Sequence, residues 1–187
     1  MAERDDVLLE NLREALRQVQ RYTVWGIGSA LSYFALATTD LGSTSVDVPV
    51  PGSFGSFVSV NTEFAKVLAL AIFWVAGAMA VYTHEGAIRI SRALQCNPDL
   101  LRAALTFPSI ATEIYGLVRV SAALIPAGLV LTGLVLDAGL RAYIGSTALL
   151  MGTAVLLSPY IVFAIELGSR SLPVEVPAKL SLGDKDK

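Results

Sequence analysis

Four long apolar stretches, separated by polar segments, dominate the pattern of the chain. They cover residues 22–39, 63–83, 117–136 and 142–166. A helix that crosses a membrane needs about 20 predominantly apolar residues, and all four stretches are close to that length. Backbone groups in hydrocarbon must bond to one another, so each stretch is expected to be helical. The pattern predicts an all-α integral membrane protein with four transmembrane helices.

Residues 1–21, before the first span, have a helical pattern of their own, with apolar side chains at Leu8, Leu12, Ala15, Leu16 and Val19. This long, mixed-charge start is unlike a signal peptide, so the first span is expected to be retained. The amphipathic helix either lies on the membrane surface or continues straight out of the first span and packs against a neighbour. Its balanced charge favours the second arrangement. Glu10 and Arg13 are the expected attractive pair on its charged face.

The loop of residues 40–62, between the first two spans, has a strand-like pattern. Val46, Val48 and Val50 alternate with other residues, and Pro51-Gly52 is a turn signal. Further apolar residues follow the turn, which predicts a short β-hairpin. An isolated hairpin is marginally stable in water, so this one requires support from elsewhere. The alternative is a Gly/Ser-rich linker without regular structure.

The loop of residues 84–116, between the second and third spans, predicts a helical hairpin. Residues 86–95 form its first expected helix. Asn97-Pro98-Asp99 is a typical helix start, with an N-cap, a proline at the first helical position and an acid in the first turn. Phe107-Pro108 ends that second helix. In contrast, residues 137–141 make only a tight turn between the last two spans, and residues 167–187 form a tail.

The distribution of Lys and Arg predicts the orientation of the spans. One predicted side has twelve of them: Arg4, Arg13, Arg17, Arg21, Arg89, Arg92, Arg102, Arg119, Arg170, Lys179, Lys185 and Lys187. The other side has two, Lys66 and Arg141. Because basic residues are retained in the cytoplasm, both termini and the helical hairpin are expected there, in a plasma membrane or a bacterial inner membrane. The β-hairpin and the 137–141 turn are then outside.

Composition agrees with this class of protein and limits its chemistry. The 187 residues are 54% hydrophobic and 16% charged, with a formal net charge of −2. A soluble domain averages roughly 25% charged residues, and a nucleic-acid binder is strongly basic, so neither class fits. One His and one Cys cannot supply a multi-ligand metal site without carboxylates. No catalytic or cofactor motif occurs, so we expect no enzyme, no metal and no cofactor.

Two groups of charged residues are nevertheless candidates for function. An outer rim, or pore entrance, would comprise Asp40, Glu63 and Asp137. An acidic ring of this kind attracts cations if several subunits surround a pore, although Asp137 could equally cap its own turn. An inner charge network would comprise His84, Glu85, Glu113, Arg119 and Glu166. Charges at that depth either pair as structural contacts or form an ion pathway.

Small residues spaced four apart favour close helix contacts, within one bundle or between subunits. They occur at Gly26/Ala30, Gly28/Ser32, Ala123/Ala127, Gly128/Thr132 and Ala148/Gly152.

The expected protein is a non-enzymatic homo-oligomer that acts as a scaffold or membrane-anchoring subunit for a cytoplasmic protein partner. Its surroundings are membrane lipids, and no nucleic acid is involved. The alternative function is a homo-oligomeric ion channel or pore.

Overall fold

The structure is a computed structural model that describes residues 2–38, 45–49, 57–94, 109–112, 116–137 and 146–169. Its long helices are α1 (Ala2–Thr38), α2 (Thr62–Ala93), α4 (Gly116–Leu136) and α6 (Ser146–Ser169). Two short strands, β1 (Ser45–Pro49) and β2 (Phe57–Asn61), and the 3₁₀ helix η2 (Ile110–Thr112) complete it. The predictions made for Asp40, Glu113, residues 95–108 and the 170–187 tail concern residues outside those described.

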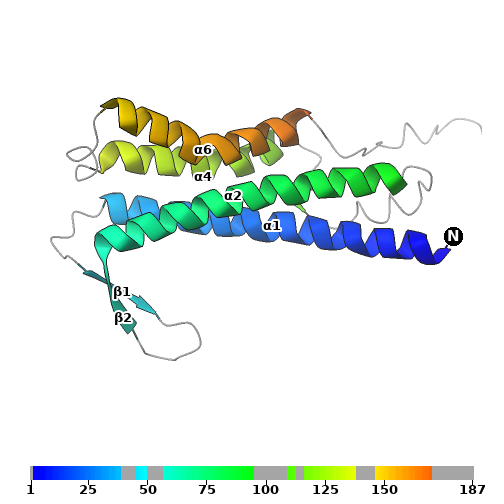
Figure 1. The fold of residues 1–187 in the computed structure, drawn as a ribbon, viewed down its shortest axis with the longest axis horizontal. Coiled ribbons are helices and arrows are strands. Elements are labelled where there is room, and N and C mark those ends of the chain that lie inside the picture. The colour runs from blue at the N-terminus through cyan, green and yellow to red at the C-terminus, as the bar shows by residue number, and fades with distance from the viewer. Residues whose placement is uncertain are drawn as a thin grey trace, which may run out of the picture.

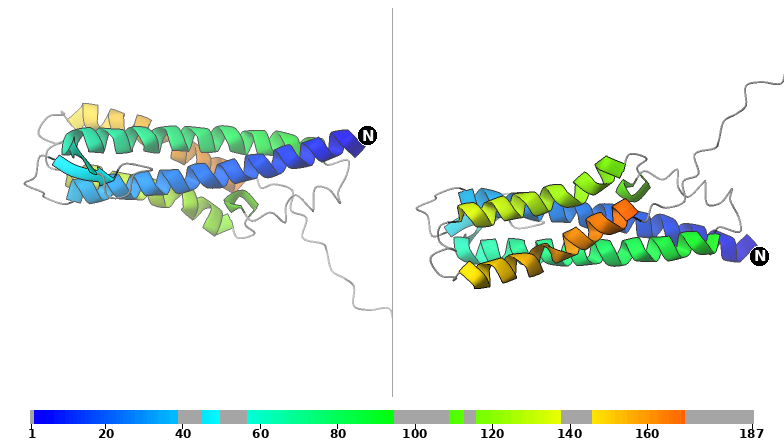
Figure 2. Two further views of the ribbon diagram at one scale, coloured as in Figure 1. Left: turned by 90° about the horizontal axis from the view of Figure 1, so that it is seen from below. Right: turned by 90° about the horizontal axis from the view of Figure 1, so that it is seen from above.

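The four long helices form one bundle in which successive helices run in opposite directions (Figures 1 and 2). α1 packs against α2 and α4, and α6 packs against α4 and α2. The described part of the chain is therefore predominantly helical, as predicted. The strands and the chain's N-terminus lie at opposite ends of the molecule.

Three helices are long and apolar enough to cross a membrane: Thr62–Ala93, Gly116–Leu136 and, within α6, Ala148–Ser169. Their outer surfaces carry large exposed apolar side chains, including Phe64, Leu117, Leu150 and Met151. A soluble monomer rarely exposes contiguous apolar surface on this scale. These helices indicate a membrane location. The first predicted span, residues 22–39, falls in α1, which ends at Thr38. α1 is not among these three candidate membrane-spanning helices.

Helix length divides the bundle into two parts. α4 has 21 residues and α6 has 24, or about 32 and 36 Å at 1.5 Å per residue, which matches a hydrocarbon core of about 30 Å. α1 has 37 residues and α2 has 32, or about 55 and 48 Å. Both continue past the end of α6 as a two-helix extension (Figure 1). We call the parts of these two helices that lie beyond the predicted span boundaries, residues 2–21 of α1 and 84–94 of α2, the stalk.

The stalk corrects one boundary predicted from sequence and agrees with one prediction. A separate helix over residues 86–95 is wrong in its start, because α2 is unbroken from Thr62 to Ala93. Gly86 does not interrupt it, since a helix tolerates one interior glycine at a cost of about 1 kcal/mol. α1 is likewise unbroken from Ala2 to Thr38 and packs on α2. This is the predicted straight continuation of the first span, although the neighbour it packs against is α2 of the same chain and not another protein.

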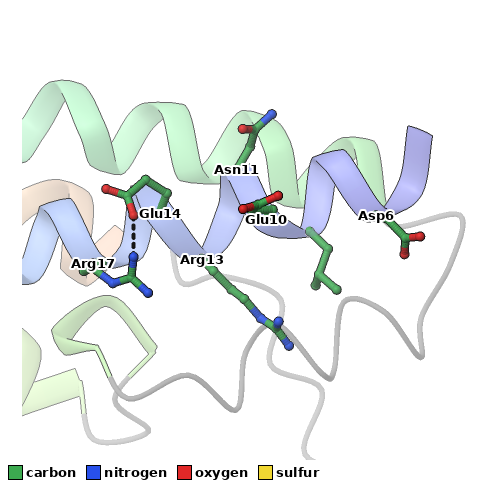
Figure 3. Close-up of a pocket in the computed structure, with 7 residues that line it drawn as sticks. Asp6, Glu10, Asn11, Arg13, Glu14 and Arg17 are labelled. Atoms are coloured by element: carbon green, nitrogen blue, oxygen red, sulfur yellow. Dashed lines mark hydrogen bonds and ion pairs between the residues drawn. The ribbon is translucent and has the colours of Figure 1, made fainter. Parts of the chain in front are cut away.

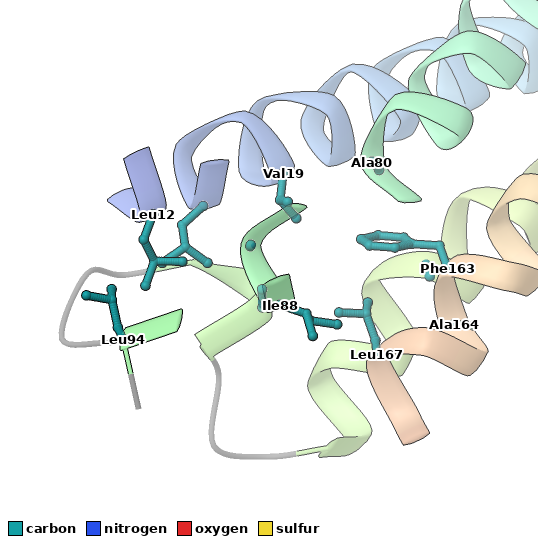
Figure 4. Close-up of a cluster of buried hydrophobic side chains, with 12 residues drawn as sticks. Leu12, Val19, Ala80, Ile88, Leu94, Phe163, Ala164 and Leu167 are labelled. Atoms are coloured by element: carbon teal, nitrogen blue, oxygen red, sulfur yellow. The ribbon is translucent and has the colours of Figure 1, made fainter. Parts of the chain in front are cut away.

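A continuous apolar core joins the stalk to the bundle (Figure 4). Its buried members come from α1, α2, η2, α4 and α6: Leu12, Leu16, Val19, Ala80, Ala87, Ile88, Leu94, Ala111, Ala123, Phe163, Ala164 and Leu167. The apolar face predicted for residues 1–21 is thus covered by the chain's own α2 and η2. η2 is also tied to α1 by hydrogen bonds, because Ser109 Oγ donates to Leu16 O at 3.2 Å and Ile110 N donates to Gln20 Oε1 at 3.1 Å.

The second part of the core, nearer the strands, is built around two buried tyrosines. The Tyr160 ring of α6 stacks on Phe73 of α2, with ring centroids 4.2 Å apart. It lies against Gly26 of α1 and Gly77 of α2, where a Cβ atom would meet the tyrosine ring or its hydroxyl. On the other side of the bundle, Tyr33 lies against Gly133 of α4. Glycine therefore provides the space that lets these rings fill the bundle interior.

Pro159 interrupts the hydrogen bonding of α6, and a neighbouring helix compensates. Proline has no N–H, so the carbonyl of Val155, four residues earlier, loses its helical partner. Trp74 Nε1 of α2 donates to that oxygen at 3.2 Å, and Ser158 Oγ donates to it at 2.7 Å. α6 bends along its length (Figure 1), as expected at an internal proline. The hydrogen bond from Trp74 joins α2 to α6. It also satisfies a carbonyl group that would be costly to leave unbonded in lipid.

β1 and β2 pair as an antiparallel hairpin with Val46 opposite Val60 and Val48 opposite Val58. This confirms the predicted strands, while their connection lies outside the described residues. β2 leads directly into α2, because Asn61 Oδ1 accepts hydrogen bonds from the backbone N–H groups of Glu63 and Phe64 at 2.9 and 3.3 Å. Both strands contact the start of α2, which supplies the support that an isolated hairpin lacks.

Candidate functional site

Three charged side chains meet at the end of the bundle that carries the hairpin. Lys66 Nζ lies 2.9 Å from Glu63 Oε1 and 3.1 Å from Asp137 Oδ2. The side chains of Lys66 and Asp137 are only 12% and 3% exposed, whereas that of Glu63 is 69% exposed. Lys66 therefore bridges a buried carboxylate and a solvent-exposed one. The bridge from α2 to Asp137 could not be read from spacing, because the two residues are far apart in the chain.

The position of Asp137 explains why it needs a cation. It directly follows α4, and its backbone N–H donates to Gly133 O at 2.8 Å. The C-terminus of a helix carries partial negative charge, so a buried carboxylate there is unfavourable without compensation. Lys66 supplies that compensation. Of the predicted outer rim, the structure brings Glu63 and Asp137 together through Lys66, and Asp40 lies outside the described residues.

His84, Glu85, Arg119 and Glu166 are the described members of the predicted inner charge network. His84 is 1% exposed, and its ring lies edge-on to Phe163 with centroids 6.0 Å apart. Glu85 instead pairs with exposed Arg89 at 3.2 Å. Among the described residues, no ion pair joins Arg119 to Glu166. The Arg119 guanidinium extends back towards Gly116 at the start of α4, which is how a long cationic side chain near a span end reaches the polar boundary.

A polar hollow lies along one face of the stalk. A hollow of about 550 Å³ lies along the first half of α1 (Figure 3). Its described lining consists of Asp6, Leu9, Glu10, Asn11, Arg13, Glu14 and Arg17. Arg17 Nη1 pairs with Glu14 Oε2 at 2.6 Å, a pair three residues apart that sequence analysis overlooked in favour of Glu10 and Arg13. The exposed Glu10 and Arg13 remain available to a partner's charges.

In the described part of the chain, no three His, Cys, Asp or Glu side chains are grouped closely enough to hold a metal ion. The acidic and basic groups lie at the two ends of the bundle, and its interior is filled by aromatic and aliphatic side chains. The fold and these sites define a helical membrane protein with a polar stalk. Comparison with models of protein families, with curated proteins and with solved structures finds no match to this chain.

Proposed function

We propose that this protein is a four-span scaffold whose stalk holds a soluble protein partner at the membrane surface. The observation that carries the proposal is the stalk itself: α1 and α2 continue as regular helices beyond the length that a bilayer requires. In this proposal the second half of α1 is the fourth span. It is flanked by α2 and α4, both apolar enough to cross a membrane.

The separation of charge supports an orientation in which the stalk is cytoplasmic. Arginines of the described helices gather towards the stalk end: Arg13, Arg17, Arg21, Arg89, Arg92 and Arg119. At the hairpin end, the basic side chain within the described residues is Lys66. Basic residues accumulate on the cytoplasmic side of membrane proteins. Both described chain ends of the bundle, at Ala2 and Ser169, then face the cytoplasm.

Burial within the stalk favours one of its surfaces for the proposed partner. The apolar positions Leu12, Leu16 and Val19 are 0% exposed against the chain's own helices. A partner therefore meets the opposite face, with its hollow and its exposed charges. Binding through complementary charge gives specificity and fast association at a modest hydrophobic gain, which suits a docking platform.

Exchanging two charges on that face should release the partner. We expect Glu10→Lys combined with Arg13→Glu to lower partner recovery more than about tenfold, because like charges placed together cost several kcal/mol. The measurement is quantitative mass spectrometry after affinity purification of the protein from cross-linked native membranes. The matched control exchanges the exposed pair of α2, Glu85→Lys with Arg89→Glu, and should leave recovery unchanged. Equal recovery from both variants would contradict docking on α1.

The channel alternative has no specific support within one bundle. Tyr33, Phe73, Val130 and Tyr160 fill its interior, so a pore would have to lie between subunits. Three hydroxyls of the proposed spans donate to carbonyls of their own helices: Ser32 to Gly28, Thr132 to Gly128 and Thr153 to Leu149. Gly28, Gly128 and Gly152 face outwards with open space around them, and these small surfaces support the proposed homo-oligomer.

A further inference from the structure

An apolar groove lies between α1 and α2 on the outer surface of the bundle. It is lined by Tyr22, Trp25, Ala71, Ile72, Val75 and Ala76 and has a volume of about 240 Å³. Small side chains form part of its lining, and the Trp25 side chain, 59% exposed, stands at its edge. The groove lies in the part of α1 that the proposed function places in the membrane.

An arginine stands at the stalk end of this groove. Arg21 is exposed and directly precedes Tyr22 in α1. It is one helical turn from Trp25, so the two side chains share a face of the helix. Among the described ion pairs, Arg17 is paired with Glu14 and Arg89 with Glu85, and Arg21 takes part in none. Its charge is thus available to an anion beside the groove.

We propose that the groove and Arg21 form a binding site for one anionic phospholipid. An acyl chain lies between α1 and α2, and the phosphate group pairs with Arg21. Trp and Tyr side chains are enriched at the level of lipid headgroups, where their rings sit between apolar and polar surroundings. Tyr22 and Trp25 would occupy that level here. The inference rests on the proposed function, because it requires this part of α1 to lie within the bilayer.

Charge favours a lipid over a second copy of the chain. A second copy would have to bring an acidic group to Arg21. Glu14 and Glu85 are already paired with arginines, and the exposed Glu10 lies about 16 Å along the helix axis from the level of Arg21. A lipid phosphate carries the missing charge, and its acyl chain is apolar like the lining of the groove.

Competition between two phospholipids tests this site in the purified, delipidated full chain. Phosphatidylglycerol and phosphatidylcholine with identical acyl chains are added in equal amounts, and retained lipid is counted by native mass spectrometry. One arginine near a membrane surface contributes about 1 kcal/mol of attraction, which corresponds to about a fivefold preference for the anionic lipid. Arg21→Gln should abolish that preference. Arg89→Gln, which removes the same charge from an exposed position of α2, should retain it.

A second variant tests the groove without changing charge. Ala71 is exposed, so Ala71→Leu fills the groove from outside the bundle and should reduce retention of both lipids. The site would be overturned if the wild type retained the two lipids equally, or if Arg21→Gln kept the preference for phosphatidylglycerol. It would also be overturned if Arg89→Gln lost that preference, or if Ala71→Leu retained both lipids fully. Dimers in place of lipid adducts would overturn it in favour of a second copy. These outcomes are independent of span topology, which is measured separately.

Discussion

Replacing Lys66 by methionine should lower the free energy of unfolding by about 3–5 kcal/mol, the usual cost of removing one partner from a buried ion pair. The variant keeps the length and apolar stem of the side chain but removes the cation beside Asp137. That carboxylate, 3% exposed at the C-terminal end of α4, would lose its ion pair with Lys66. Equilibrium unfolding of the detergent-solubilised protein, followed by circular dichroism, measures the loss.

Two further variants separate the buried pair from its exposed neighbour. Glu63→Gln should change stability by less than about 0.5 kcal/mol, because the Glu63 side chain is 69% exposed and surface pairs contribute little. Asp137→Asn in the Lys66→Met background should recover a large part of the loss, since it removes the buried charge. A Lys66→Met protein as stable as the wild type would show that Lys66 does not neutralise Asp137.

Adding one methyl group at Gly26 should destabilise the bundle by about 1–3 kcal/mol, the range for overpacking a well-packed core. The new Cβ would collide with the Tyr160 hydroxyl, and the Tyr160 ring is held between Phe73 and Gly77. Alanine is otherwise the better helix former by about 1 kcal/mol, so the sign of the effect distinguishes packing from propensity. The same unfolding measurement applies.

Gly28→Ala is the matched control, one half-turn away on the same helix. Nothing lies within 4 Å of its added Cβ, so this variant should be at least as stable as the wild type. Tyr160→Phe removes the colliding hydroxyl, for which the described residues provide no hydrogen-bond partner, and should partly rescue Gly26→Ala. Equal stability of Gly26→Ala and Gly28→Ala would contradict the proposed packing of Tyr160.

The helices were predictable from sequence because apolar runs and helical spacing are local signals. Residues 63–83, 117–136 and 142–166 correspond to helices long and apolar enough to cross a membrane. The hairpin strands were also recognisable from alternating valines. The separate helix predicted over residues 86–95 was wrong in its start, because the polar residues that follow Thr83, beginning with His84, do not interrupt the hydrogen bonding of α2.

The contacts between helices could not be predicted, because they join residues distant in the chain. The bridge from Lys66 to Asp137 and the place of Tyr160 against Gly26 and Gly77 depend on which helices are neighbours. Sequence analysis identified Gly26 and Ala30 as a close-contact motif but gave no indication that a tyrosine ring would occupy the space. Similarly, Pro159 predicts a free carbonyl, whereas its donor, Trp74, is evident only from the fold.

The candidate surfaces were predicted in part. Sequence analysis assigned the amphipathic face of residues 1–21 to protein contacts, and the structure covers Leu12 and Leu16 with α2 and η2 of the same chain. This moves the proposed partner to the charged face around Glu10 and Arg13. The prediction of an outer acidic rim is revised in the same way, because the Asp137 carboxylate is buried beside Lys66 and is not exposed to solvent. Burial decides both cases, and burial depends on the tertiary structure.

The central claim, that α1 is a fourth span and the stalk is cytoplasmic, is tested most directly by locating two residues relative to the membrane. Arg13→Cys and Asp47→Cys, both at exposed positions, are made separately with Cys96→Ser and treated with a membrane-impermeant maleimide on intact cells. The account predicts labelling at position 47 alone, with position 13 labelled only after permeabilisation. Labelling of both positions, or of neither, in intact cells would place them on one side and contradict a membrane-spanning α1.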